Sequence, residues 1–328
     1  MEPKRIFITG ANGFVGRHLI AHLVETFGSR ISIFAAVRPE EATNLASGPC
    51  SAGWTGRANE HVRIVAFDVL DAAQVKAAVA SANPDQIIHL AARSSGADTD
   101  RDAIMAVNVE GTRNVLEAAA MLSPFPRALV VSTGYVYGST DPGRPAREED
   151  PIGPLWRYGP YTDSKIQMES VVRNYRAFAL IARPFSHTGP GQARGFALPG
   201  FAYQLARIER GLDPPVLNVG NLSATRDLLD VRDVVRAYVC LMSAGEAGEA
   251  YNIATGVPII IGDAVDQLRA MCNVPTRIEV DPTRLRPAEI SCSSGDPLRT
   301  WSTTQWSPRI SIDRTLEDTL NYMRLLTQ

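Results

Sequence analysis

The feature of this sequence that most restricts its fold is a glycine-rich turn close to the N-terminus. The apolar run 5–9 has the composition of a buried β-strand, and the segment 17–24 beyond the turn has the periodicity of a helix. Between them Gly10, Gly13 and Gly16 follow the spacing GxxGxxG. In a strand–turn–helix unit the first glycine permits the tight turn, the second lets the backbone approach a pyrophosphate, and the third lets the helix pack closely on the strand. The segment therefore predicts a dinucleotide site, with an ordinary glycine-rich turn as the alternative.

Beyond the turn, strand and helix patterns alternate along the chain. Apolar runs separated by helical patterns are typical of βαβ units, in which right-handed crossovers connect parallel strands. We therefore expect an α/β fold, a doubly wound Rossmann-type parallel sheet with a smaller C-terminal substrate-binding lobe. The expected strands are 31–37, 62–67, 86–90, 128–132, 179–183 and 250–254, and the expected helices are 71–82, 100–121 and 161–177.

The expected domain boundaries lie where this alternation weakens. After Pro184 prolines and glycines become frequent, which is typical of loops at the C-terminal edge of such a sheet. We expect residues 1–184 and about 226–255 to form the NADP-binding domain, and about 185–225 together with 256–328 to form the substrate-binding lobe.

The expected cofactor contacts extend beyond the glycine turn. An acidic residue at the end of the second strand usually holds the ribose 2′-hydroxyl of NAD, whereas an arginine accommodates the 2′-phosphate of NADP. Arg38 stands at this place, and no carboxylate lies between the end of this strand and Glu40. The sequence therefore favours NADP(H), with NAD(H) as the alternative if Arg38 is merely solvated. Asp68, after the third strand, either accepts a hydrogen bond from adenine or caps the next helix. The cofactor contacts predicted from these segments are Gly10, Asn12, Gly13, Phe14, Val15, Gly16, Arg38 and Asp68.

Tyr161 and Lys165 are the strongest candidates for chemistry. Their i, i+4 spacing places a phenol and an ammonium on one face of a helix, and no other tyrosine of this chain is followed by lysine four residues later. A nearby cation lowers the pKa of a phenol, so that it can exchange a proton with a sugar or alcohol oxygen near neutral pH. The alternative is a surface helix that carries an unrelated lysine.

Composition excludes several other classes of function. A formal net charge of −2 gives no basic patch for nucleic acid or a membrane surface. Cys50, Cys240, Cys272 and Cys292 are scattered without a CxxC motif, so neither a disulfide framework nor a metal site is expected. No apolar stretch has membrane-spanning length, and Met1 leads directly into the first strand rather than into a signal peptide. We therefore expect a cytoplasmic protein with reduced thiols.

Five motifs occur in an order that resembles the extended short-chain dehydrogenases/reductases. They are the glycine turn, His89-Leu90-Ala91-Ala92, Asn108, Ser132-Thr133 and Tyr161-x-x-x-Lys165. The resemblance implies that Thr133 hydrogen-bonds the reacting oxygen and that Tyr161 is the acid/base. It also implies that Lys165 holds the nicotinamide ribose and lowers the tyrosine pKa, while Asn108 shapes the helix behind the site. Further cofactor contacts implied by it are Val69, Leu90, Ala91, Ala92, Tyr161 and Lys165.

The C-terminal half resembles the GDP-4-keto-6-deoxy-D-mannose reductases within that superfamily. The similarity lies in the segments 182–192, 204–209, 219–221, 225–227, 286–290, 295–297, 306–308 and 315–316. It implies that Arg226 and Arg286 clamp the diphosphate and that Glu289 contacts a ribose hydroxyl. A homodimer through the helices 100–121 and 161–177 is the corresponding expectation. The implied substrate contacts are Ser94, Thr133, Ser186, His187, Arg207, Arg226, Arg286 and Glu289.

Two departures from these families bear on the reaction. Dehydratases of the superfamily carry an acidic residue after the Ser/Thr, because elimination of water needs an extra acid/base. This chain has Gly134 and Tyr135 there, so simple reduction or epimerisation is expected instead. The second departure is Ser186, which stands where the reductase signature usually has asparagine.

The resulting expectation is an NADPH-dependent reductase of a nucleotide-linked 4-keto-6-deoxyhexose. The favoured substrate is GDP-4-keto-6-deoxy-D-mannose, and the product is GDP-D-rhamnose or its C4 epimer GDP-6-deoxy-D-talose. One alternative is a nucleotide-sugar 4-epimerase with tightly bound NAD, and another is reduction of a UDP-, dTDP- or CDP-linked sugar. A non-catalytic NADP-sensing regulator is the alternative from a different class, and the presence of Tyr161 and Lys165 argues against it.

Overall fold

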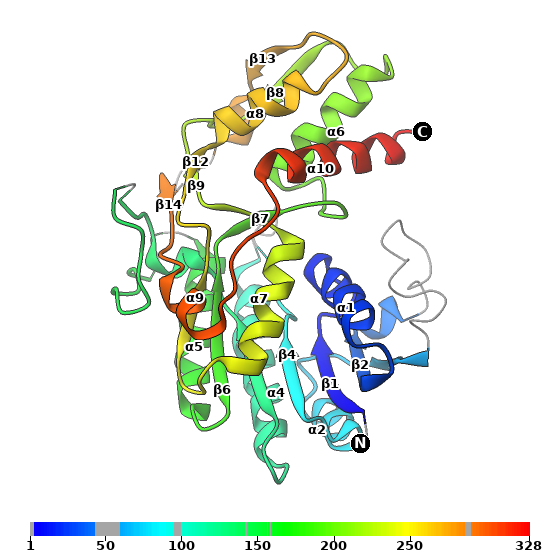
Figure 1. The fold of residues 1–328 in the computed structure, drawn as a ribbon, viewed down its shortest axis with the longest axis vertical. Coiled ribbons are helices and arrows are strands. Elements are labelled where there is room, and N and C mark those ends of the chain that lie inside the picture. The colour runs from blue at the N-terminus through cyan, green and yellow to red at the C-terminus, as the bar shows by residue number, and fades with distance from the viewer. Residues whose placement is uncertain are drawn as a thin grey trace.

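The computed structural model describes residues 3–42, 60–94, 100–141, 143–155, 157, 159–285 and 290–328. Within these ranges the centre of the molecule is a parallel sheet of seven strands in the order β11–β6–β5–β4–β1–β2–β3 (Figure 1). This confirms the expected α/β fold with a Rossmann-type parallel sheet. The strands are β1 (Lys4–Thr9), β2 (Ile31–Val37), β3 (Val62–Ala66), β4 (Gln86–His89), β5 (Arg127–Val131), β6 (Ala179–Pro184) and β11 (Ala250–Ile253).

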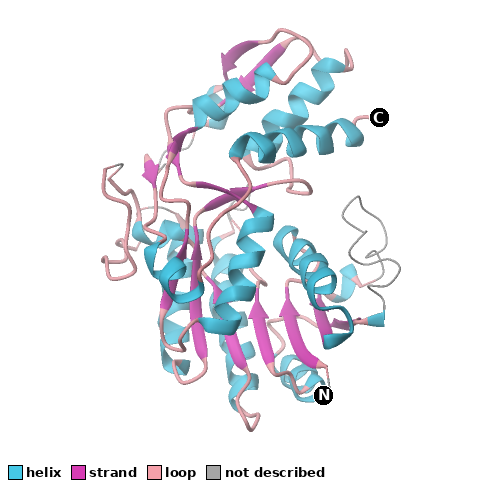
Figure 2. Ribbon diagram, in the orientation of Figure 1, coloured by secondary structure: helices cyan, strands magenta, loops and turns pink. Residues whose placement is uncertain are grey.

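The sheet is covered by helices on both faces, which explains its continuous apolar strands. Helices α1 (Phe14–Phe27) and α7 (Val231–Ala244) pack together on one face (Figures 1 and 2). The opposite face carries α2 (Ala72–Ala82), α4 (Gly111–Ala120) and α5 (Pro160–Val172). Each face has its own apolar core, so that alternate residues of β1, such as the fully buried Phe7 and Ile8, contribute to different cores.

The segment expected as one helix over 100–121 is interrupted. It consists of α3 (Arg101–Met105), a π-helical turn at Ala106–Glu110 and α4. The amide of Gly111 donates to the carbonyl of Ala106, five residues earlier, which widens the helix by one residue at this point. The expected helix 161–177 is also shorter, because α5 ends at Val172 and a 3₁₀ turn over Arg173–Tyr175 follows it.

A smaller group of elements lies beyond the carboxyl ends of the strands. It has a separate apolar core, to which Leu205, Leu217, Leu268 and Leu320 contribute without exposure to solvent. Figure 1 shows α10 lying across α6 at this end of the molecule. The elements of this core are α6 (Ala197–Glu209), β8 (Val216–Val219), α8 (Ile261–Ala270) and α10 (Ile312–Leu326), and the exposed strand β13 (Arg277–Val280) pairs with β8.

Short strands connect this group to the sheet. They form one pair and one set of three in addition to the β8–β13 pair. These connecting strands are β7 (Ser186–Thr188), β9 (Thr225–Arg226), β10 (Leu228–Asp230), β12 (Ile259–Ile260) and β14 (Cys292–Ser293). Helix α9 (Leu298–Thr304) follows them in the chain and returns to pack on α7 and β11. Among the helices described, none has the length and apolar character needed to cross a membrane.

Candidate active site

The glycine turn forms a cradle that larger residues would fill. Gly10 adopts φ +65°, and a Cβ added there would lie 2.7 Å from the amide nitrogen of Ala91. A Cβ on Gly16 would lie 2.5 Å from the carbonyl oxygen of Gly10 and 2.6 Å from that of Ala11. Gly13 is the N-cap of α1 and its amide donates to Gly10. Because these glycines have no side chains, the backbone amides at the N-terminus of α1 stay accessible, which fits the pyrophosphate of a dinucleotide.

The side chains of this turn leave the helix N-terminus without negative charge. The first turn of α1 carries no acidic residue, so its positive end is not neutralised. The Asn12 side chain accepts a hydrogen bond from Arg17 at 2.7 Å, which brings a guanidinium to the turn. The Phe14 ring stacks on the His187 ring at 6.3 Å, and Val15 packs against the sheet core. The turn thus joins the predicted cofactor region to a predicted substrate residue.

Arg38 is placed at the end of β2, as predicted, but it is not merely solvated. Its guanidinium lies 2.9 Å from a Glu40 carboxylate oxygen and 2.6 Å from one of Glu41, and all three side chains are partly or largely exposed. A 2′-phosphate at this position would share the guanidinium with two carboxylates. The strength of the NADP preference therefore depends on these neighbours as well as on Arg38.

Asp68 does not cap the helix that follows it. Its carboxylate accepts from the amide of Leu70 at 2.9 Å and closes a turn, whereas Asp71 caps α2. The alternative interpretation of Asp68 as an N-cap is therefore wrong. The carbonyl of Val69 accepts from the Asn114 side chain at 3.0 Å, which ties this turn to α4.

The segment after β4 passes directly beneath the glycine turn. The amide of Leu90 donates to the carbonyl of Thr9, and the amide of Ala91 donates to the Thr9 hydroxyl, both at 3.2 Å. Ala91 and Ala92 have small, half-buried side chains. Ser94 is exposed at the end of this segment.

Tyr161 and Thr133 are brought into contact at the N-terminus of α5. Thr133 follows β5 and its hydroxyl caps a 3₁₀ turn over Gly134–Tyr137, while Gly159 is the N-cap of α5. A side-chain hydrogen bond joins Thr133 to Tyr161. Burial raises the pKa of Tyr161 to about 12, although the hydrogen bond to Thr133 opposes this. The expectation that a neighbouring cation lowers the pKa of this phenol is therefore wrong, because desolvation is the larger effect.

Lys165 lies one turn after Tyr161 with its charge inside the protein. Its side chain is 4% exposed, its ammonium donates to the carbonyl of Val131 at 2.7 Å, and it lies 5.9 Å from the centre of the Tyr161 ring. Burial lowers the pKa of Lys165 to about 8, and the Glu169 carboxylate opposes this shift. The buried His89 nearby has a pKa lowered to about 3, chiefly by burial, and is neutral.

Asn108 lies in the π-helical turn and contacts two segments of the site. Its side chain accepts from the amide of Arg93 at 2.8 Å and donates to the carbonyl of Arg93 at 3.0 Å. It also donates to the Ser164 hydroxyl of α5 at 2.8 Å. The residue thus connects α5 to the segment after β4, in line with its predicted place behind the site.

A buried ion pair behind Lys165 was not predicted from the sequence. Glu169 and Arg183 are almost fully buried and form a two-point contact with distances of 2.9 and 2.7 Å. The Ser132 hydroxyl donates to Glu169 at 2.6 Å, and Arg183 donates to the Tyr137 hydroxyl at 2.7 Å. The only available sequence signal is that Glu169 repeats the i, i+4 spacing from Lys165, whereas Arg183 comes from another strand.

The predicted substrate residues Ser186, His187 and Arg226 lie around the turn that follows Thr133. The Ser186 hydroxyl contacts the Tyr135 hydroxyl at 3.1 Å. The Arg226 guanidinium is mostly buried and lies 6.0 Å from the centre of the Tyr135 ring. His187 makes a hydrogen bond of 2.9 Å with the carbonyl of Phe185, and burial lowers its pKa. Tyr135, which is not among the predicted substrate residues, therefore lies next to two residues that are, Ser186 and Arg226.

The remaining predicted substrate residues are not brought to this group. Arg207 lies in the last turn of α6, where its guanidinium pairs with Asp213 at 2.6 and 2.8 Å. No recorded contact within the described ranges connects Arg207 to Thr133 or Arg226. Arg286 and Glu289 lie outside the described residues.

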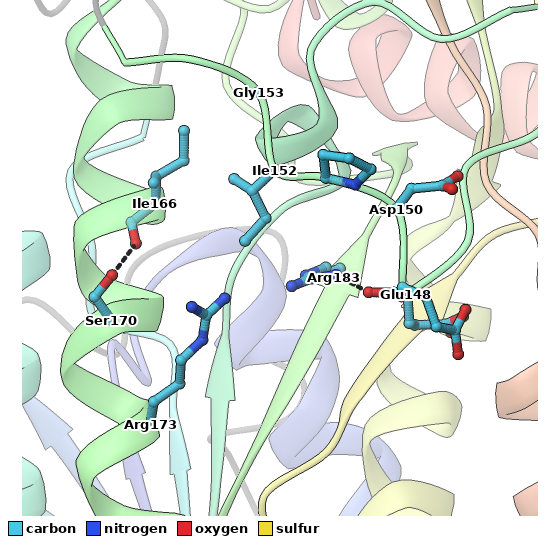
Figure 3. Close-up of a pocket in the computed structure, with 10 residues that line it drawn as sticks. Glu148, Asp150, Ile152, Gly153, Ile166, Ser170, Arg173 and Arg183 are labelled. Carbon is cyan, nitrogen blue, oxygen red and sulfur yellow. Dashed lines mark hydrogen bonds between the residues drawn. The ribbon is translucent and has the colours of Figure 1, made fainter.

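A cavity of about 390 Å³ is lined by Arg183 but does not include Tyr161. Figure 3 shows Ile166 and Ser170 of α5, and Arg173 of the 3₁₀ turn after it, facing Arg183 and the loop from Glu148 to Gly153. The cavity is lined by backbone and by charges that largely have partners, so it is not the candidate catalytic site. In the ranges described, no group of three or more His, Cys, Asp or Glu side chains is arranged to hold a metal ion.

Comparison with known proteins gives relatives over the whole chain. Residues 6–254 match the NAD dependent epimerase/dehydratase family. GDP-6-deoxy-D-mannose reductase of Pseudomonas aeruginosa is 33% identical over 97% of this chain and 96% of its own length. UDP-glucose 4-epimerase of Mycolicibacterium smegmatis is 27% identical over 99% of this chain and 100% of its own length. The solved structure of RMD from Pseudomonas aeruginosa complexed with NADPH has a TM-score of 0.80 and 31% identity, covering 99% of this chain and 98% of that chain. The protein therefore belongs to the NAD-dependent epimerase/dehydratase family, the extended short-chain dehydrogenases/reductases that its motifs resemble.

Proposed function

We propose that this protein is an NADPH-dependent reductase of the C4 keto group of GDP-4-keto-6-deoxy-D-mannose. The observation that carries the proposal is the contact between Tyr161 and Thr133, two hydroxyl donors at the carboxyl end of β5. The similarity to a GDP-6-deoxy-D-mannose reductase over almost the full length of both chains supports the substrate. The product is GDP-D-rhamnose or its C4 epimer GDP-6-deoxy-D-talose.

The proposed chemistry of the chain is proton donation to a developing alkoxide. NADPH supplies the hydride when bound. Tyr161 donates its phenolic proton to the oxygen at C4, and Thr133 donates a hydrogen bond to the same oxygen. A preorganised donor of this kind is often worth about 3 kcal/mol of transition-state stabilisation. A raised pKa suits Tyr161 to this role, because the phenol still carries its proton at neutral pH.

The residues after Thr133 argue against elimination of water at this site. A Cβ on Gly134 would lie 2.8 Å from the ring of Phe185, so the space for a side chain at this position is already filled. The next residue, Tyr135, provides a hydroxyl rather than a carboxylate. No acidic side chain is therefore available from this turn to act as the additional acid/base.

The cofactor would be held by the glycine cradle, with Arg38 beside its adenosine ribose. The fit of the cradle to a pyrophosphate supports a dinucleotide, and the relative solved with NADPH supports the phosphorylated form. Lys165 is proposed to hold the nicotinamide ribose. Its hydrogen bond to the Val131 carbonyl keeps the ammonium beside Tyr161.

The proposal is tested by following NADPH absorbance with purified protein and GDP-4-keto-6-deoxy-D-mannose, with NADH in parallel. We expect stoichiometric oxidation of NADPH, and NMR of the product identifies the C4 configuration. Tyr161→Phe should lower turnover about 10³-fold while NADPH affinity stays within twofold. Tyr175→Phe is the matched control, since Tyr175 lies about 20 Å along the helix axis from Tyr161. Absence of oxidation with either cofactor, or near-normal turnover by Tyr161→Phe, would contradict the proposal.

A nucleotide-sugar 4-epimerase is the second candidate. The observation that favours it is the pairing of Arg38 with Glu40 and Glu41, which reduces the positive charge available to a 2′-phosphate. Similarity to a UDP-glucose 4-epimerase over the full length of both chains is consistent with this function. Purified protein that releases NAD on denaturation and interconverts UDP-glucose and UDP-galactose without added cofactor would establish it.

A further inference from the structure

Tyr135 and Ser186, at which this sequence departs from the families it resembles, are in contact in the structure. Tyr135 lies in the 3₁₀ turn after β5, and Ser186 is the first residue of β7, yet their hydroxyl oxygens are 3.1 Å apart. Either hydroxyl can donate to the other. Whichever one donates, the second O–H group and the remaining lone pairs are free to bind a third group.

Tyr135 lies between the two groups that would hold opposite ends of the sugar. The amide of Tyr135 donates to the hydroxyl of Thr133, the residue that also contacts Tyr161, so the backbone of Tyr135 lies beside the proposed acid. On its other side, the Tyr135 ring is 6.0 Å from the Arg226 guanidinium. A hexose that reacts at C4 beside Tyr161 and carries its diphosphate on C1 near Arg226 must pass along Tyr135.

The backbone fixes Tyr135 in this position. Its amide donates to the Thr133 hydroxyl at 3.3 Å, and the Phe185 ring fills the space beside Gly134 and Gly295. The same ring stacks on Tyr137 with centres 6.2 Å apart. Because Ser186 directly follows Phe185 in the chain, one segment both pins the turn and supplies the hydroxyl partner. The contact is therefore formed before substrate arrives.

We propose that the Tyr135–Ser186 hydroxyl pair binds a hydroxyl group of the substrate hexose and so determines which sugar is accepted. The inference rests on the proposed function only in taking a nucleotide-linked hexose as the ligand. The pair recognises the sugar by hydrogen bonding and takes no part in the transfer of the proton or the hydride. Tyr135 and Ser186 are thus specificity-determining residues rather than catalytic ones.

The test is calorimetric binding of GDP-mannose and of GDP, which separates the contribution of the hexose from that of the nucleotide. Tyr135→Phe removes only the hydroxyl, and we expect it to weaken GDP-mannose binding about tenfold while GDP and NADPH affinities stay within twofold. Tyr175→Phe is the matched control and should bind all three ligands normally. Equal weakening of GDP and GDP-mannose by Tyr135→Phe, or no weakening of either, would overturn the proposal.

Ser186 provides a second and independent arm. Ser186→Ala should weaken GDP-mannose binding about threefold, because the Tyr135 hydroxyl loses its anchor but remains present. Ser186→Asn should restore binding, since an amide can also hydrogen-bond the phenol. The double variant Tyr135→Phe/Ser186→Ala should bind no more weakly than Tyr135→Phe alone, whereas additive losses would show that the two hydroxyls act separately and would overturn the pair.

The same comparison distinguishes failure of this inference from failure of the proposed function. If the unmodified protein binds UDP- or dTDP-hexoses but not GDP-mannose, the GDP assignment is wrong. The contribution of the hexose is then the difference in affinity between UDP-glucose and UDP, or between dTDP-glucose and dTDP. Selective loss of that contribution in Tyr135→Phe supports the hydroxyl pair. A hexose contribution that Tyr135→Phe leaves unchanged, or no binding of any nucleotide sugar by the unmodified protein, overturns it.

Discussion

At the scale of single residues, burial determines the acid–base behaviour of the candidate site. Tyr161 and Lys165 lie on one helix face, and burial shifts their pKa values in opposite directions, up to about 12 for the phenol and down to about 8 for the ammonium. Both shifts disfavour the charged form, as expected when a group leaves water. The phenol therefore keeps its proton across the physiological range, whereas the charge of Lys165 changes within it.

This difference predicts the pH dependence of turnover. Below about pH 8 Lys165 is protonated, and in the proposed mechanism its cation holds the ribose and stabilises the charge that develops on Tyr161. Above that value the ammonium loses its proton, so kcat for reduction should be constant on the acidic side and fall on the alkaline side. The measurement is kcat at saturating substrates from about pH 6 to about pH 10. Lys165→Met should lower kcat about 100-fold and remove the break near pH 8; an unchanged break in this variant would assign it to another group.

The sequence identifies these two residues but not their surroundings. The i, i+4 spacing of Tyr161 and Lys165 is local, so a helical pattern is enough to pair them. The contacts of Glu169 with Arg183 and of Tyr135 with Ser186 depend on strands that the sheet brings together from distant parts of the chain. The direction of the Tyr161 pKa shift depends on burial, which the spacing alone does not reveal. The structural surroundings, rather than the motif, therefore determine the chemistry of the pair.

At the scale of elements, the glycine turn shows how backbone proximity restricts a sequence. Gly16 lies at the first turn of α1, where the helix comes so close to the preceding turn that a Cβ would overlap two carbonyl oxygens. Replacing it must push α1 away from β1 and deform the amide-lined cradle. Gly195, in contrast, is exposed and has no atom within 4 Å of an added Cβ.

We expect Gly16→Ala to destabilise the protein by about 1–3 kcal/mol and to weaken NADPH binding at least tenfold. Gly195→Ala is the matched control and should change stability by less than about 0.5 kcal/mol without affecting NADPH. Denaturant unfolding and fluorescence titration of NADPH measure the two effects. If Gly16→Ala and Gly195→Ala behave alike, the close approach seen at α1 is not a requirement of the cradle.

Element types follow from the sequence more readily than element interruptions. The strands of the central sheet have apolar runs because both of their faces are covered, and each expected strand overlaps the observed one. The π-helical turn at Ala106–Glu110 is not visible in the pattern of 100–121, because it depends on Asn108 reaching the Arg93 backbone and Ser164. An interruption fixed by tertiary contacts has no periodic signal of its own.

At the scale of the whole molecule, Asp230 connects the sheet to the smaller group of elements. It caps α7, pairs with Arg232 at 2.7 Å, and accepts a hydrogen bond of 2.9 Å from the Thr315 hydroxyl of α10. Arg232 also pairs with Asp318 of α10 at 2.8 Å. We propose that the cofactor depends on the sheet and that the nucleotide sugar depends on the smaller group, as the predicted domain division implies. Arg226 lies at the boundary of that division, between Ala224 and Leu228 of the smaller core in the chain, whereas the glycine turn contributes Ala11 to a core of the sheet.

This division is tested by weakening only the core of the smaller group. Leu320 of α10 is fully buried in this core, together with Ala224, which precedes β9, and Ile261, which follows β12. Leu320→Ala should therefore destabilise the protein by about 2–5 kcal/mol. Because Arg226 lies in β9, the same change should loosen its support. We expect GDP-mannose affinity to fall at least threefold at a temperature where the variant is folded, with NADPH affinity unchanged. Leu326→Ala, on the same helix but 46% exposed, should leave both affinities and the stability nearly unchanged. Parallel loss of NADPH and GDP-mannose binding in Leu320→Ala would instead mean that both ligands depend on a single cooperative core, with Asp230 transmitting the loss from α10 to the sheet.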